Sequence, residues 1–114
     1  SLKCKFYACP GNHDHFGDIT AQLSYTSLSP TGRWTMPGLW YSYKYSVPGQ
    51  VTTVLFLMID TMVWTTEWHK MRLGTHSPRD WGWMVHTQKT WLTNTLKTST
   101  ADWVIVAGHY SGDS

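Results

Sequence analysis

Gly11-Asn12-His13-Asp14-His15 follows the apolar run Phe6-Tyr7-Ala8-Cys9, with only Pro10 between the two. Lys3 to Cys9 is apolar and aromatic enough to predict a short buried strand, which Pro10-Gly11 ends. The four positions after Gly11 carry one amide, two imidazoles and one carboxylate. These groups bind metal ions and transfer protons. The sequence therefore predicts a cluster of such groups where a strand ends.

A second strand with a histidine behind it lies near the other end of the chain. Trp103 to Ala107 is an apolar run that predicts another buried strand, and Gly108-His109 follows it. In open α/β sheets, sites form beyond the carboxyl ends of the strands. We therefore expect Asn12 and His109 to lie close together at the carboxyl ends of neighbouring strands, with His13 beside them.

The middle of the chain predicts a hairpin. Residues alternate with a period of two from Trp40 to Val47, which is typical of a half-buried antiparallel strand. Pro48-Gly49 predicts a turn. The continuous apolar, β-branched run from Val51 to Ile59 then predicts a strand buried on both faces.

Two further segments predict helices, and a third predicts a long loop. Asp18 to Ser27 is compatible with a short helix, and Ser77-Pro78 is a typical helix start. Apolar residues at helical spacing extend this second helix to about Thr98. Thr61 to His76 has no clean period and is predicted to be a loop. Strand, helix and strand in this order indicate an α/β fold.

The two histidine motifs resemble those of a known superfamily. Gly-Asn-His-Asp at 11–14 with Val-x-x-His at 106–109 is similar to the calcineurin-like dinuclear metallophosphoesterases. Further matches, in order along nearly the whole chain, resemble the purple acid phosphatases of the small, tartrate-resistant type. They are Phe16-Gly17-Asp18, Ala21-Gln22-Leu23-Ser24-Tyr25, Arg33-Trp34, Met36-Pro37, Leu57-Met58-Ile59-Asp60-Thr61, Trp91-Leu92 and Gly108-His109-Tyr110.

The resemblance implies a fold and a partial domain. Residues 1–114 would form one partial metallophosphoesterase domain, truncated at both ends, within the αββα sandwich of mixed β-sheets flanked by helices. The family's upstream aspartates and metal-binding tyrosine are missing from this sequence, as is its downstream Gly-His-x-His motif. We therefore expect an internal fragment of an acid phosphatase, and the fragment alone is expected to be inactive.

The resemblance also implies roles for individual residues. Asn12 and His109 would bind the divalent ion of a dinuclear centre that pairs Fe(III) with Fe(II), Zn(II) or Mn(II), and the remaining ligands would lie outside this chain. His13 would donate a hydrogen bond to a phosphoryl oxygen or a proton to the leaving group. Asp14 would orient a neighbouring imidazole, although helix capping is an equal alternative for this carboxylate.

Other polar residues have simpler interpretations. Asp60 also follows a predicted strand, and we expect it to cap the loop that comes next. His15 is a weaker candidate for a site role. His69, His76 and His86 have no partner at metal-ligand spacing and are expected to be surface or half-buried residues.

Composition excludes several classes of partner. The chain is 41% hydrophobic and 14% charged, which indicates a folded domain. Its net charge of +2 is too small to predict nucleic-acid or membrane-surface binding. Cys4 and Cys9 would lie about 16 Å apart on one strand, too far for a disulfide. By resemblance the substrate would be a small phosphomonoester or a phosphoprotein, and the protein would be secreted or lie in the lysosome or endomembrane system.

Three other functions compete with this interpretation. One is another dinuclear metallophosphoesterase, such as a phosphodiesterase or nucleotidase. A second is a catalytically inactive homologue. The third is a carbohydrate-binding module without a metal, which the eight tryptophans suggest. A separation of more than about 10 Å between Asn12 and His109 would favour that module, because donor atoms of one site must lie closer.

Overall fold

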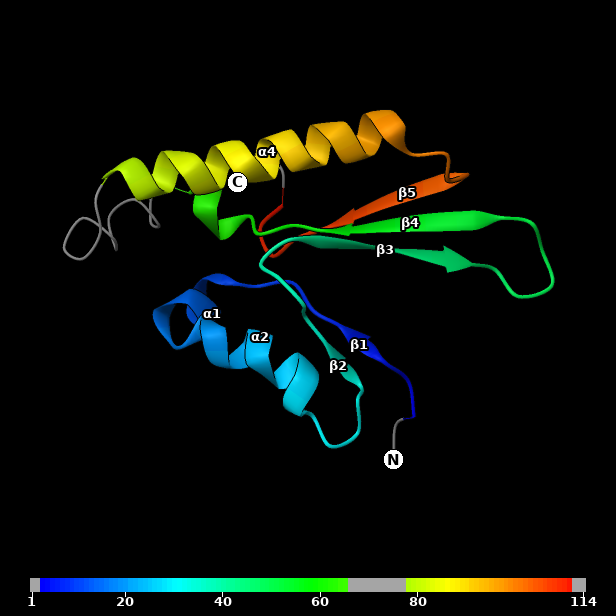
Figure 1. Cartoon of the computed structure of the whole chain (residues 1–114), viewed down its shortest axis with the longest axis horizontal. Helices are drawn as coiled ribbons and strands as arrows, with labels where there is room; N and C mark the ends of the chain where they lie inside the picture. Colours follow the sequence, from blue (N-terminus) through cyan, green and yellow to red (C-terminus); the bar gives the residue numbers. More distant parts are fainter. Residues whose placement is uncertain (1–2, 66–77, 112–114) are drawn as a thin grey trace.

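The computed structural model describes residues 3–65 and 78–111 of the chain and has the mixed α/β architecture that the sequence predicts. Figure 1 shows helix α4 along one side of a three-stranded sheet, with a strand pair and two short helices on the other side. The elements are β1 (Phe6–Tyr7), α1 (Asn12–Phe16), α2 (Ile19–Leu28), β2 (Trp34–Thr35), β3 (Tyr41–Ser46), β4 (Thr53–Met58), η1 (Met62–Trp64), α4 (Pro78–Thr98) and β5 (Trp103–Ala107).

The predicted hairpin is formed by β3 and β4. The two strands are antiparallel, with Tyr41 opposite Met58 and Ser46 opposite Thr53. Gly49 in the connecting turn has a φ of 75°, a conformation that glycine adopts without strain. This pairing confirms both the period-two strand and the turn at Pro48-Gly49.

Helix α4 carries the chain from β4 to the parallel strand β5. The helix begins at Pro78 and ends at Thr98, as predicted, and the predicted cap Ser77 lies outside the described residues. The register places Met58 beside Ala107, so the carboxyl ends of β4 and β5 are level. The predicted loop from residue 66 onward, with His69 and His76, also lies outside the described residues.

Aromatic side chains join the small β1–β2 pair to the larger sheet. The ring of Tyr7 on β1 stacks on Tyr43 of β3 at 3.9 Å between centroids, and Tyr43 stacks on Phe56 of β4 at 4.8 Å. The Tyr41 hydroxyl lies 2.9 Å from the carbonyl oxygens of both Ala8 and Thr35. These contacts hold the carboxyl end of β1 near those of β4 and β5.

The predicted burial of the strands is wrong in part. The first strand is only two residues long, and Phe6 is 45% exposed. Strand β4 is fully buried only at Leu57 and Met58, and Trp103 on β5 is 67% exposed. The physical reason is that β5 is the edge of a three-stranded sheet, whereas the core gathers where β4 meets η1 and α4. Strand β2 was missed, because two residues carry no period.

Two further features are the state of the cysteines and the polarity of the helices. Cys4 and Cys9 are both free, as expected, although Cys4 is exposed and Cys9 is only half-buried. Within the described ranges no helix is both long and apolar enough to cross a membrane.

Candidate metal site at the strand ends

The two residues predicted to share a site are in contact. His109 Nε2 lies 3.1 Å from Asn12 Oδ1, although the residues are 97 positions apart in the chain. Asn12 is the first residue of α1, and His109 comes two residues after the end of β5. The predicted proximity is confirmed. The expectation that the two preceding strands are neighbours is wrong, because β1 and β5 belong to two different sheets. The residues that follow the carboxyl ends of these two strands meet at the Asn12–His109 contact.

The glycine before each ligand candidate is explained by close packing. A methyl group on Gly11 would lie 3.0–3.2 Å from three ring atoms of His109. A methyl group on Gly108 would lie 2.6 Å from Cγ2 of Thr61 and 3.0 Å from Cγ1 of Ile59. Both distances are below ordinary carbon contacts. The Asn12–His109 contact therefore depends on the missing side chains of two glycines.

Asn12 to His15 lie on the short helix α1, beyond the end of β1. Gly11 precedes α1, and its amide donates a hydrogen bond of 2.8 Å to Oδ2 of Asp14. Gln22 of α2 donates a second hydrogen bond to Asp14, through its side-chain amide. Burial alone would raise the pKa of Asp14, but the hydrogen bonds from Gln22 and Gly11 outweigh it, and the pKa lies below its ordinary value. These bonds correspond to the helix-capping alternative for Asp14.

His13 lies on the solvent side of α1. The side chain is exposed, and its ring meets Phe16 edge-on at 5.4 Å between centroids. It follows Asn12 directly in the sequence. The imidazole of His13 is therefore accessible from solvent.

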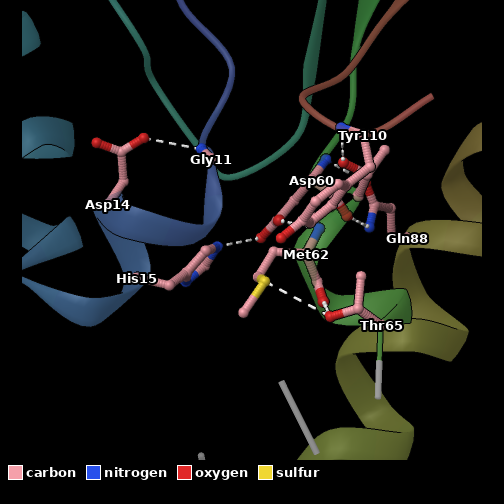
Figure 2. A network of polar contacts seen from close by, with 9 residues as sticks. Gly11, Asp14, His15, Asp60, Met62, Thr65, Gln88 and Tyr110 are labelled. Carbon is pink, nitrogen blue, oxygen red and sulfur yellow. Dashed lines mark hydrogen bonds and ion pairs between the residues drawn. The ribbon is translucent and has the colours of Figure 1, made fainter. Parts of the chain in front are cut away.

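A buried contact between His15 and Asp60 joins α1 to the segment after β4 (Figure 2). His15 Nε2 lies 2.8 Å from Oδ2 of Asp60, and the two residues are only 5% and 0% exposed. The other oxygen of Asp60 accepts a hydrogen bond of 3.1 Å from the amide of Met62, which confirms the predicted capping role. Sequence reasoning missed the partner. The available signal was a carboxylate at the end of an apolar run, since a buried charge needs a partner.

Asp60 is also held from the opposite side. Gln88 of α4 is fully buried and makes two hydrogen bonds with the main chain of Asp60. Its Oε1 accepts from the Asp60 amide at 2.8 Å, and its Nε2 donates to the Asp60 carbonyl at 3.0 Å. The next residue, Thr61, accepts a hydrogen bond of 2.9 Å from the amide of Tyr110. Asp60 and Thr61 thereby connect helix α4 to the loop after β5.

The donor atoms of Asn12 and His109 fit part of a metal-ion coordination shell. Two donors about 2.1 Å from one ion and at right angles to each other are about 3 Å apart, close to the observed 3.1 Å. A carboxamide oxygen and an imidazole nitrogen both bind divalent ions. Among the described residues no group of three or more His, Cys, Asp or Glu could hold an ion. The pair therefore fits part of a site and not a complete one.

Comparison with known proteins identifies related chains. No protein-family model matches the sequence. Tartrate-resistant acid phosphatase type 5 from Rattus norvegicus is 37% identical over 106 residues, and the Homo sapiens protein is 33% identical over 109 residues. The alignments cover 92% and 95% of this chain but only 32% and 33% of those proteins. Purple acid phosphatase 3 from Arabidopsis thaliana is 30% identical over 118 residues, covering 97% of this chain and 30% of that protein.

A solved structure has a similar fold. The chain resembles a structure described as GAP50, the anchor in the inner membrane complex of Plasmodium, with a TM-score of 0.68 and 25% identity. The match covers 94% of this chain and 33% of that one. The close contact of Asn12 with His109 argues against a carbohydrate-binding module. By sequence, the chain is a relative of the purple acid phosphatases, and it spans about a third of the length of the relatives it matches.

Proposed function

We propose that this chain supplies part of the active site of an acid phosphatase, which hydrolyses phosphate monoesters at a dinuclear metal centre. The contact of 3.1 Å between Asn12 Oδ1 and His109 Nε2 is the observation that carries the proposal. The acid phosphatases among its relatives support the reaction class. We further propose Fe(III) with Fe(II), Zn(II) or Mn(II) as the metals, and a small phosphomonoester or a phosphoprotein as the substrate.

Asn12 and His109 would be ligands of the divalent ion. The carboxamide of Asn12 is a neutral donor, so it would bind the ion without adding negative charge that repels phosphate. The Nδ1 side of the His109 ring is packed against Gly11, which leaves Nε2 as the nitrogen that faces Asn12. When bound, the metal pair would neutralise phosphate charge and lower the pKa of the attacking water.

His13 would act on the substrate and not on the metal. His13 follows Asn12 in the sequence and its ring is exposed, so the imidazole would donate a hydrogen bond to a phosphoryl oxygen. As the bond from phosphorus to the leaving oxygen breaks, a proton from the His13 imidazolium would neutralise the departing alkoxide. Asp14 would support this geometry from below, by holding the start of α1 through Gly11 and α2 through Gln22.

A segment exchange tests the proposal. The aligned segment of the rat relative is replaced by this chain, and hydrolysis of p-nitrophenyl phosphate is measured together with metal content. We expect turnover in the exchanged protein. His109→Ala should lower metal content and activity together. His13→Ala should leave the metals in place and lower the catalytic rate by about 10²–10⁴-fold.

The control is His86→Ala, on the exposed side of α4, which should change neither metal content nor rate. A folded, metal-loaded exchange protein without turnover would contradict the catalytic proposal and favour a non-catalytic relative. Loss of metal in His13→Ala would make His13 a ligand and overturn its assignment as a substrate-facing group.

A further inference from the structure

The adjacent residues Asp60 and Thr61 lie between the two halves of the candidate metal site. Asp60 is fully buried and Thr61 is 9% exposed. They come two and three residues after Met58, the last residue of β4, which lies beside the last residue of β5. One residue of the pair contacts the helix that carries Asn12, and the other contacts the loop that carries His109.

Asp60 fixes the orientation of α1. It binds Nε2 of His15 at 2.8 Å, in a site from which water is excluded. His15 lies three positions after Asn12 on the same helix, so the two side chains project from neighbouring turns of one face. A helix of five residues does not hold itself in place, because helices this short are unstable alone. The contact with Asp60 therefore sets where Asn12 points.

Thr61 fixes the loop on the other side. Its hydroxyl oxygen accepts the hydrogen bond from the amide of Tyr110, and its methyl group fills the space above Gly108. His109 is thus held at the residue before it and at the residue after it. The pair itself is anchored to α4 by the two hydrogen bonds between Gln88 and the Asp60 main chain.

We propose that Asp60 and Thr61 are positioning residues that together set the separation of Asn12 and His109. The inference rests on the proposed function of that pair as metal ligands. It assigns Asp60 and Thr61 no contact with metal or substrate. They act through His15 and through the loop from Gly108 to Tyr110.

The test compares matched substitutions at the two ends of β4. Asp60→Asn and Thr61→Val alter the site end. Asp102→Asn and Thr53→Val alter an equivalent cluster at the far end, where Asp102 accepts from the amide of Thr53 at 2.7 Å and from its hydroxyl at 3.0 Å. Thr61→Ser keeps the hydroxyl and serves as the conservative variant. Two quantities are measured on the ¹⁵N-labelled chain. The first is the nuclear Overhauser effect between the side-chain amide of Asn12 and the ring of His109. The second is the Zn²⁺ affinity, taken from the Zn²⁺ concentration at which the ¹⁵N shift of His109 Nε2 changes.

We expect Asp60→Asn and Thr61→Val to weaken the Overhauser effect and to reduce Zn²⁺ affinity at least about tenfold, the loss typical for residues that orient metal ligands. Thr61→Ser keeps the hydrogen bond to Tyr110 but loses the methyl group above Gly108, so both quantities should lie between those of Thr61→Val and those of the unaltered chain. The far-end variants should lower the melting temperature without changing Zn²⁺ affinity. If Asp60→Asn fails to fold, Thr61→Val decides, because valine keeps the shape of threonine.

Two results would overturn the positioning proposal. One is an unchanged Overhauser effect and Zn²⁺ affinity in the folded site-end variants. The other is an equal loss in the far-end variants, which would mean general destabilisation. Failure of the proposed function would look different: Zn²⁺ would not shift His109 in the unaltered chain, while the Overhauser effect would still report whether the two residues set the geometry.

Discussion

Replacing Gly11 by alanine would press a methyl group against the ring of His109. The new carbon would lie 3.0 Å from Nδ1, 3.1 Å from Cγ and 3.2 Å from Cε1. Ordinary carbon contacts are about 3.5–4.0 Å, so the ring must retreat by about 0.5 Å. The contact between His109 Nε2 and Asn12 Oδ1, now 3.1 Å, would then exceed hydrogen-bond range.

The structure separates the cost in stability from the cost in binding. Overpacking in a filled core costs about 1–3 kcal/mol, but His109 is exposed and can swing outward. We therefore expect Gly11→Ala to destabilise the chain by less than about 1 kcal/mol, below that range. Zn²⁺ affinity at the pair should nevertheless fall at least about tenfold, because ligand orientation is lost.

Thermal unfolding and Zn²⁺ titration of the same samples measure the two effects. Gly82→Ala is the matched control, since a methyl group there meets nothing within 4 Å and the residue lies inside α4. It should raise stability by about 0.5–1 kcal/mol and leave Zn²⁺ affinity unchanged. Normal Zn²⁺ affinity in Gly11→Ala would refute the argument that this glycine sets the ligand geometry.

Three further predictions follow from other parts of the molecule. Burial raises the pKa of Cys9, which is half-buried, whereas Cys4 is exposed. Iodoacetamide should therefore modify Cys4 faster than Cys9, and equal modification rates measured by peptide mass spectrometry would contradict this. Burial raises the pKa of Tyr41 from 10.0 to about 12, so its contribution to stability is complete below pH 10 and is lost as the pH rises towards 12. Tyr41→Phe should cost about 1 kcal/mol at neutral pH and remove that alkaline loss in urea titrations; an unchanged alkaline loss would exclude Tyr41 as its source. Finally, two ligands cannot hold a dinuclear centre, so this chain alone should not retain two metal ions after desalting or hydrolyse p-nitrophenyl phosphate, and stoichiometric retention of two ions would overturn the expectation.

The proximity of Asn12 and His109 could be predicted because local signals place both residues. Each follows an apolar strand and a glycine, and strand ends in α/β folds gather at one edge. The hairpin and the long helix were likewise predictable from their periods and turn residues. The site could thus be outlined without coordinates, although its two strands belong to separate sheets.

The buried contacts beneath the site could not be predicted in the same way. His15 and Asp60 are 45 positions apart, and no spacing rule pairs them. The exposure of β5 also escaped prediction, because the run from Trp103 to Ala107 reads as buried while the structure places it at a sheet edge. An apolar run indicates that a strand can be buried, but it does not indicate which neighbouring elements cover the strand.

The central claim is that Asn12 and His109 bind one divalent ion together. Zn²⁺ titration of the ¹⁵N-labelled chain, followed at the side-chain nitrogens of all six histidines and at the Asn12 amide, tests it most directly. If the pair binds one ion, the largest shift of His109 should be at Nε2, the Asn12 side-chain amide should shift with it, and Asn12→Ala should weaken the response. A Zn²⁺ response confined to other histidines, with His109 and Asn12 unmoved, would contradict it.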